Sequence, residues 1–138
     1  MAKLVLKDCF IEVDGVDFSS HVNAASLSMK KAAVETTNFS GGGKEVVAGL
    51  KDDTIEITFQ QDFAPASVDA VLYPLYDLEQ EFTVKVRPTA AAVSASNPEY
   101  SATCVLLEYT ALSGKVGDLS EIKVTFPTQR SGIARATA

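Results

Sequence analysis

The chain has 138 residues, of which 46% are hydrophobic, and it carries a formal net charge of −6. This length is typical of one domain, and the apolar content is enough for a hydrophobic core without disulfides or metals. The acidic balance argues against a nucleic-acid binder, because contacts to phosphates require lysine and arginine in excess. We expect a single domain spanning residues 1–138.

The two cysteines indicate neither a disulfide bond nor a metal site. Cys9 and Cys104 are far apart in the sequence and neither has a neighbouring cysteine or histidine, so we expect two free, partly buried thiols. Near the N-terminus, Lys7 and Asp8 interrupt the apolar run before a signal-peptide core could form. No apolar stretch is long enough to span a bilayer. These features predict a protein made in the cytoplasm, with no membrane partner.

The first half of the chain is predicted to be mostly strands. Residues 9–20 indicate a hairpin, because Asp14 and Gly15 form a turn pair between apolar residues. Apolar and polar residues then alternate, which is typical of strands with one buried face. The alternating segments are 25–31, 33–39 and 53–63.

One helix is predicted, at residues 67–78. Ser67 is placed to cap its N-terminus, and Asp69 in the first turn is favourable for the helix dipole. Pro74 predicts that the helix bends or ends nearby. The residues at helical spacing form a stripe that must lie on a core: Val68, Val71, Leu72 and Leu75.

The second half returns to strands. Segment 81–88 alternates, 89–98 is a loop of small residues, and 99–112 is apolar on both faces, which predicts a central or doubly covered strand. A turn at Ser113–Gly114 leads to a further strand around Ile122, Val124 and Phe126. With seven or eight strands, the predicted fold is mainly β, with two packed antiparallel sheets (a β-sandwich or half-barrel) and one short flanking α-helix.

The glycine cluster in "TTNFSGGGKEVVAGLKDD", residues 36–53, does not fit a phosphate-binding loop. Such a loop needs a glycine five residues before the Gly-Lys pair and a Ser or Thr just after it. Here Asn38 and Glu45 occupy those positions. A carboxylate at the second position would repel phosphate, so the glycines favour a flexible segment.

No catalytic, cofactor or metal site is predicted, and we expect a protein that is not an enzyme. His21 is the only histidine, and Ser19 and Ser20 precede it without an orienting acid at a suitable spacing. A histidine in a turn or at a strand edge is the simpler interpretation. The acidic residues of the middle of the chain lack the pattern of a calcium loop and indicate a polar turn: Asp52, Asp53, Glu56 and Asp62.

Several segments resemble the tail tube (major tail) proteins of long-tailed bacteriophages, in particular those of actinobacterial phages and prophages. The resemblance covers nearly the whole chain in the same order of elements. Its most specific pieces are "AGLKD" before a strand ending in "FQQDF", the helix "SVDAVLYPLY", "NPEY" before a long strand, and "VGDLSEIKVTFP". None of these is a catalytic motif.

This resemblance implies a structural subunit that forms stacked hexameric rings around a lumen that conducts DNA during genome delivery. The implied partners are further copies of the chain and the tape measure, tail tip and tail terminator proteins, and the DNA passes without specific binding. The implied location is the virion tail, assembled in the host cytoplasm, and the non-contractile tail type is favoured. An acidic protein suits such a lumen, because a basic wall would bind the phosphates.

Two assembly segments follow from the resemblance. In the family, the loop equivalent to residues 40–50 tends to be mobile in the monomer and to order against a neighbour. We expect the same of residues 40–50 here, and of a C-terminal arm at 128–138 that has little to bury and could be removed without unfolding the sandwich. The residues concerned are Ser40, Gly41, Gly42, Gly43, Lys44, Glu45, Val46 and Val47 in the loop, and Arg130, Ile133 and Arg135 in the arm.

Two alternatives remain from the sequence. One is the tube protein of a secretion or contractile injection system, which would carry protein effectors, and genomic neighbours would distinguish it from a phage protein. The other is a β-sandwich ligand-binding module, for which exposed aromatic residues would be expected. The chain has no tryptophan, and its tyrosines lie in segments expected to face the core or an interface: Tyr73, Tyr76, Tyr100 and Tyr109.

Overall fold

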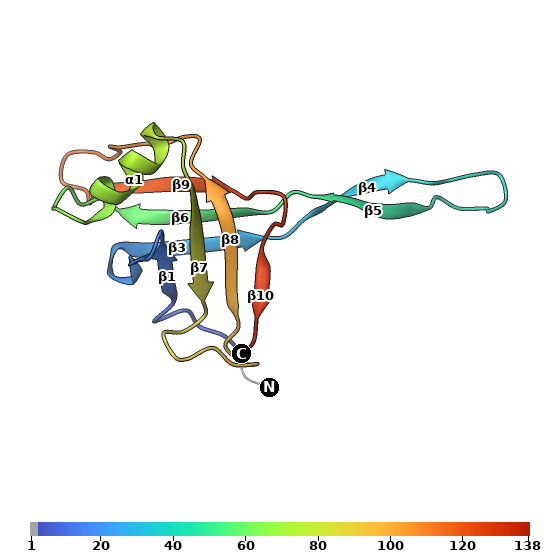
Figure 1. Ribbon diagram of the computed structural model, residues 1–138, viewed down its shortest axis with the longest axis horizontal. Coiled ribbons are helices and arrows are strands. Elements are labelled where there is room, and N and C mark those ends of the chain that lie inside the picture. Colours follow the sequence, from blue (N-terminus) through green and yellow to red (C-terminus); the bar gives the residue numbers. More distant parts are fainter. Residues whose placement is uncertain (1–2) are drawn as a thin grey trace.

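Antiparallel strands dominate the computed structural model, which describes residues 3–138 (Figure 1). These residues contain ten strands, one α-helix and one short 3-10 helix, so the predicted mainly β class is confirmed, with more strands than the seven or eight expected. The bounds are β1 (Phe10–Val13), β2 (Val16–Asp17), η1 (Ser19–His21), β3 (Val22–Ser28), β4 (Lys31–Glu35), β5 (Val46–Lys51), β6 (Thr54–Gln60), α1 (Val68–Asp77), β7 (Glu81–Arg87), β8 (Glu99–Val105), β9 (Glu121–Pro127) and β10 (Ala134–Ala136).

The strands form three sheets. One has five strands in the order β10-β8-β7-β1-β2, the second has three in the order β3-β6-β9, and the third is the two-stranded pair β4-β5. In Figure 1 the strands of the five-stranded sheet run across those of the three-stranded sheet, α1 lies near one end, and β4-β5 leaves from the other. The first two sheets therefore form the predicted sandwich, and the third extends outside it.

The core lies between the two larger sheets. A chain of edge-to-face aromatic contacts joins them: Phe18 to Phe59 at 5.7 Å between ring centroids, Phe59 to Phe126 at 6.3 Å, and Phe126 to Phe82 at 5.6 Å. Because Phe82 belongs to β7 and Phe126 to β9, the last contact connects the two sheets. Alternate residues of the predicted strands supply the rest of the core, including Ile55, Ile57, Val84, Val86, Ile122 and Val124.

Most predicted strands are confirmed, with shifted ends. The Asp14–Gly15 turn joins β1 to β2, and both residues have positive φ, as a tight hairpin turn requires. β8 is paired on both sides, by β10 and β7, as expected of a central strand. It ends at Val105, however, and Leu107 is exposed, so the predicted strand 99–112 was too long.

The helix is confirmed where predicted, although its N-terminus is held differently. Val68, Leu72 and Leu75 are buried as expected, and α1 continues through Pro74 to Asp77. Ser67 occupies the N-cap position but makes no capping bond. Its hydroxyl donates instead to Asp62 at 2.9 Å. Within residues 3–138, α1 falls short of the length that a membrane-crossing helix needs.

Both cysteines are free thiols, as predicted. Cys104 is buried in β8, and burial raises its pKa to about 12. Cys9 is half-buried just before β1, and burial, together with the nearby Asp8, also raises its pKa. Because the thiolate is the reactive form, both cysteines are poor nucleophiles near neutral pH.

Candidate assembly surface

The most prominent external feature is the hairpin formed by β4 and β5, which projects away from the sandwich (Figure 1). Its strands pair Lys31 with Lys51, Val34 with Val47, and Glu35 with Val46. From the sequence, one strand at 33–39 followed by a loop at 40–50 is expected. The structure instead has strands at Lys31–Glu35 and Val46–Lys51, so the second half of the predicted loop is a strand.

The hairpin exposes apolar side chains along its length. Every residue of β4 is exposed, and in β5 only Gly49 is partly covered. Val34 is 48% exposed, Val47 50% and Leu50 85%. An isolated two-stranded hairpin is marginally stable in water, and its unpaired edges are ready to pair with another chain. The hairpin is therefore a surface that lacks a partner within the described chain.

The glycines lie at the tip of this hairpin. A Cβ atom added at Gly41, Gly42 or Gly43 would meet nothing within 4 Å, so packing does not require glycine at these positions. Below the tip, Thr36 donates its amide to the Glu45 carbonyl at 2.9 Å. Of the predicted loop residues, Ser40 to Glu45 lie at or beside the tip, and Val46 and Val47 lie in β5.

The hairpin root contains a buried carboxylate. Asp53 is 2% exposed and accepts hydrogen bonds from the backbone amides of Lys30 at 2.9 Å and Ile133 at 2.8 Å. The Lys51 ammonium lies 3.5 Å from the same carboxylate. Burial alone would raise the pKa of Asp53, but the two amides and Lys51 outweigh it and lower that pKa. From the sequence, Asp53 was expected only to be part of a polar turn that leads into the strand at Thr54.

The C-terminal segment is part of the folded domain, which corrects the expectation that it has little to bury. Ile133 is 4% exposed and belongs to the core. β10 pairs with β8, and Thr128 donates through its amide and its hydroxyl to the Asp53 carbonyl. Arg130 and Arg135 are exposed. Ile133 is a single large apolar residue in this segment and belongs to no periodic pattern, so its burial could not be predicted from the sequence.

The outer face of the β3-β6-β9 sheet is polar. Most of the residues that alternate with the covered ones are serine, threonine, glutamine or charged side chains, and Ala24 of β3 is exposed as well. Glu56 and Lys123 form an ion pair there at 3.2 Å, with both side chains well exposed. Glu121 lies on the same face of β9. This face therefore carries two glutamates and one lysine among neutral polar groups.

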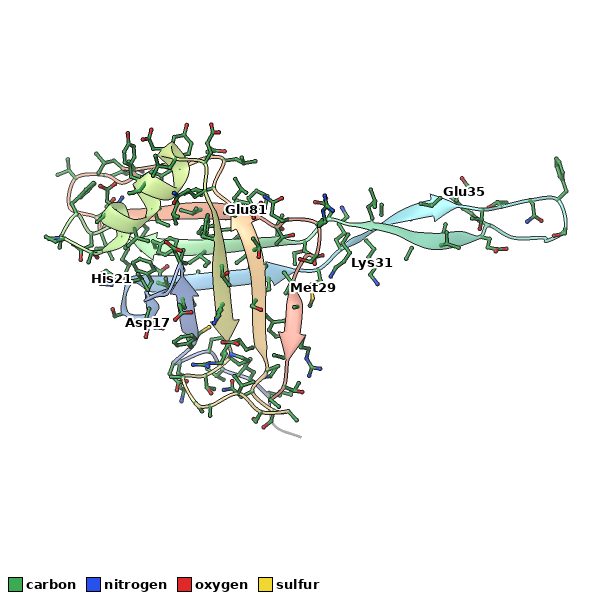
Figure 2. All side chains as sticks on the ribbon, viewed as in Figure 1. Asp17, His21, Met29, Lys31, Glu35 and Glu81 are labelled. Carbon is green, nitrogen blue, oxygen red and sulfur yellow. The ribbon has the colours of Figure 1, made fainter. Side chains whose placement is uncertain are left out.

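A second polar cluster lies at the far end from the hairpin, where Figure 2 labels His21. The His21 Nε2 atom donates to the Asp62 carboxylate at 2.9 Å, and Ser20 Oγ lies 3.1 Å from Nδ1. From the sequence, no acid is expected to orient His21, and that expectation is wrong, since the fold brings Asp62 to it. Hydrogen bonds from the Ala64 amide, Ser67 and His21 lower the pKa of Asp62.

This cluster is structural in its contacts. It joins η1 to the turn before α1, because Asp62 accepts bonds from both. Ser20 and His21 are adjacent residues at the end of η1, Ser20 exposed and His21 partly exposed. No group of three or more His, Cys, Asp or Glu side chains in residues 3–138 is placed to hold a metal ion.

Two of the four tyrosines do not face the core, which leaves an interface as the expected position for them. Tyr73 and Tyr76, three residues apart on α1, are exposed at 52% and 42%. Tyr109 is partly buried, donates to Asp69 at 2.7 Å and accepts from Gln61 at 3.0 Å. Burial and the nearby Asp69 carboxylate raise the pKa of Tyr109 to about 12. The outer side of α1 is thus a second place with exposed large side chains.

The comparison with solved structures identifies the fold. A chain of the cryo-EM structure of an extracellular contractile injection system, the PVC sheath–tube complex in its extended state, matches with a TM-score of 0.71 over 99% of this chain and 93% of that chain. This protein has a tail-tube-like fold. The identity is 10%, so the likeness is one of fold. No family model and no curated protein sequence matches the chain.

Proposed function

We propose that this tail-tube-like protein is a structural subunit of a tube, in which copies of the chain form hexameric rings and the rings stack. The observation that carries this proposal is the β4-β5 hairpin, which extends from a stable domain and exposes valines and strand edges. The fold it belongs to is shared with a chain of a sheath–tube complex. In the assembled tube, the hairpin packs on a neighbouring copy.

The energetics favour such packing. Fully burying a valine or leucine stabilises by roughly 1.5–3 kcal/mol. Four such residues of the hairpin are between 48% and 85% exposed: Val34, Val46, Val47 and Leu50. Together they supply several kcal/mol if a neighbour covers them, to which backbone pairing along the hairpin edges adds. Lys44 and Glu45 near the tip provide charges that can pair with a neighbouring subunit.

The β3-β6-β9 sheet is the proposed wall of the lumen. Among the described residues, β3 and β9 each have one strand neighbour, β6, so both have a free edge. Joining these edges between six copies would close a barrel and remove the exposed edges. Its inner surface would then be the polar face with Glu56, Glu121 and Lys123, whose small acidic excess lets a phosphate backbone slide past.

Two kinds of tube fit these features. The resemblance in the sequence favours a phage tail tube in the virion tail, with DNA in the lumen and the tape measure, tail tip and terminator proteins as partners. The structural likeness to an injection-system complex favours a tube that carries protein effectors. A tape measure gene beside this gene supports the phage tube, and effector and baseplate genes without capsid genes support the other.

The C-terminal segment has a weaker role in this proposal. Arg130 and Arg135 are exposed on a segment anchored by Ile133. We place them at a contact with a neighbouring subunit or ring, where their charge meets the acidic surface of the next copy. The anchor fixes their position in the monomer, so this contact needs no ordering of a free arm.

The test is assembly of the purified protein, observed by negative-stain electron microscopy with and without tail-tip components. The hairpin variant is Val34→Thr with Val47→Thr, which keeps the β-branched shape but adds a hydroxyl to each side chain. The control is Val116→Thr, at a fully exposed valine outside the hairpin. We expect tubes from the wild type and the control, and none from the hairpin variant, with equal circular dichroism. A wild type that stays monomeric at high concentration with tail-tip components present would overturn the proposal.

A further inference from the structure

The chain runs from β3 into β4 and from β5 into β6, so two stretches of backbone connect the sandwich to the hairpin. The β3-β6 and β4-β5 hydrogen-bond ladders, however, do not join at this connection. The last pair of β3 with β6 is Ser28 with Thr54, and the first pair of β4 with β5 is Lys31 with Lys51. Met29, labelled at this junction in Figure 2, lies outside both ladders. One backbone bond crosses the interruption, from the Asp52 amide to the Lys30 carbonyl at 2.7 Å. A ribbon joined by so few bonds can pivot.

Asp53 closes this interruption with its side chain. One carboxylate oxygen accepts a hydrogen bond from the Lys30 amide, between β3 and β4, and the other accepts one from the Ile133 amide of the C-terminal segment. Lys51 of β5 approaches the latter oxygen. Hydrogen bonds to a charged group are stronger than neutral ones, and a buried site strengthens them further. One carboxylate therefore holds three segments of the chain at the hairpin root.

The surroundings are fitted to this carboxylate. A Cβ atom at Gly132 would lie 2.5 Å from the Asp53 oxygen and 2.8 Å from Lys51 Cε, and Gly132 has a φ of +65°. Glycine is thus required by both space and backbone conformation. Lys51 also donates to the carbonyls of Ser131 and Ile133. The C-terminal segment wraps closely around the root, as seen beside β10 in Figure 1.

We propose that Asp53 is a positioning residue for assembly, because it fixes the direction in which the hairpin leaves the sandwich. This inference rests on the proposed function, since the direction matters when copies dock on one another. A hairpin that is already held in its docking direction loses less conformational freedom on binding. This preorganisation strengthens binding without any additional contact between the copies. The lysine of the "AGLKD" segment then has a role, as Lys51 is a partner of Asp53.

The carboxylate cannot be replaced by an amide of the same shape. Asparagine at this position has one oxygen and one NH2 group. If the oxygen faces Ile133, the NH2 group meets the Lys30 amide, and if it faces Lys30, the NH2 group meets Ile133 and Lys51. Either way a buried donor loses its acceptor. Asp53→Asn therefore releases the hairpin from one side of the root.

The experiment measures hairpin orientation in the monomer by NMR residual dipolar couplings of backbone amides. In the wild type, the amides of β4 and β5 share the alignment of the sandwich. In Asp53→Asn we expect hairpin couplings reduced by about twofold or more, while those of the sandwich are kept. The matched control is Asp52→Asn, the same change at the neighbouring exposed aspartate. We expect it to match the wild type.

Lys51 gives a second, milder pair of variants in case Asp53→Asn does not fold. Lys51→Met removes the charge and keeps an apolar stem, and Lys51→Arg keeps the charge. We expect hairpin couplings to fall in the first and to be restored in the second. Unchanged hairpin couplings in Asp53→Asn, or in Lys51→Met where the former is unfolded, would overturn the inference.

Assembly provides the link to function. We expect the concentration needed for tubes to rise about tenfold in Asp53→Asn, which corresponds to a contact weakened by about 1.4 kcal/mol. Tubes forming at the wild-type concentration from a variant with a released hairpin would contradict the positioning role. The couplings are measured on monomers, so a wild type that never forms tubes would count against the proposed function and leave the orientation result standing.

Discussion

The sandwich and the hairpin are built from similar strands but bury their side chains very differently. In β6, β7 and β9, alternate residues are fully buried while their neighbours are partly or fully exposed. In β4 every residue is exposed, and Val34 and Val47 pair with each other on a surface that nothing covers. The sandwich thus satisfies its apolar residues within one chain. Under the proposed function, the apolar residues of the hairpin are covered by a neighbouring copy. The following substitutions test this difference between the two regions.

The largest expected effect is that of a Phe→Ala substitution in the sandwich, compared with the same substitution in the hairpin. Phe126→Ala removes the ring that contacts Phe59 and Phe82, and such changes reduce the free energy of unfolding by about 3–5 kcal/mol. That is a large part of the roughly 5–15 kcal/mol typical of a domain. Phe39→Ala, at the hairpin tip where the ring is fully exposed, should change it by less than about 0.5 kcal/mol. Urea unfolding measures both, and equal losses would contradict the comparison.

The C-terminal segment should behave as part of the sandwich. Ile133→Ala is expected to reduce the free energy of unfolding by about 2–5 kcal/mol, because it opens a cavity in the core. Val116→Ala, at an exposed position, serves as the control. Removal of residues 128–138 should also destabilise, since it deletes Thr128 and Ile133, which donate hydrogen bonds to Asp53. A truncated chain as stable as the wild type would restore the simpler idea of a free arm.

Acid should loosen the root of the hairpin. The folded-state pKa of Asp53 is lowered, so its contribution is fully present above the unfolded value of about 3.9 and is lost as pH falls through the lower folded value. Urea unfolding between about pH 5 and pH 2 should therefore show a smaller pH dependence in Asp53→Asn than in the wild type. Identical pH dependences in the two proteins would mean that ionisation of the Asp53 carboxylate does not contribute to the free energy of unfolding.

The smallest effect on the monomer is expected at the hairpin tip. Gly42→Pro should change the free energy of unfolding by less than about 0.5 kcal/mol, because a Cβ there meets nothing. Tube formation should fall more, since a proline ring stiffens a tip that has to adapt to a neighbour. Thermal unfolding and electron microscopy measure the two effects. A comparable loss of both would show that the tip matters to the domain itself.

The sequence was sufficient for the strands that bury one face. Residues 54–60, 81–87 and 121–127 alternate because the sandwich covers one side of each, and the Asp14–Gly15 turn has a local backbone cause. The helix stripe was predicted for the same reason. The hairpin strand β5 was not, because Val46 and Val47 are consecutive, Gly49 interrupts the pattern, and no core imposes a periodicity on exposed residues.

The parts that were missed depend on contacts between distant residues. Asp53 meets Ile133 across 80 positions and Asp62 meets His21 across 41. Neither pair has a spacing that sequence reasoning could use. Ile133 stands alone among small and charged residues, so its burial was hidden as well. The assembly roles of the hairpin and of Arg130 and Arg135 remain predictions, to be tested on assembled protein.

The continuity of the hairpin with the sandwich has a mechanical consequence. β4 extends β3 and β5 extends β6, so a pull on the hairpin tip runs along the strands of the three-stranded sheet. Because the tip pulls β3 and β6 together, such a load shears the β6-β9 hydrogen bonds all at once, where a pull across the strands would open them one after another. In the proposed tube, each subunit would therefore pass tension from its neighbour along the strands of its own three-stranded sheet.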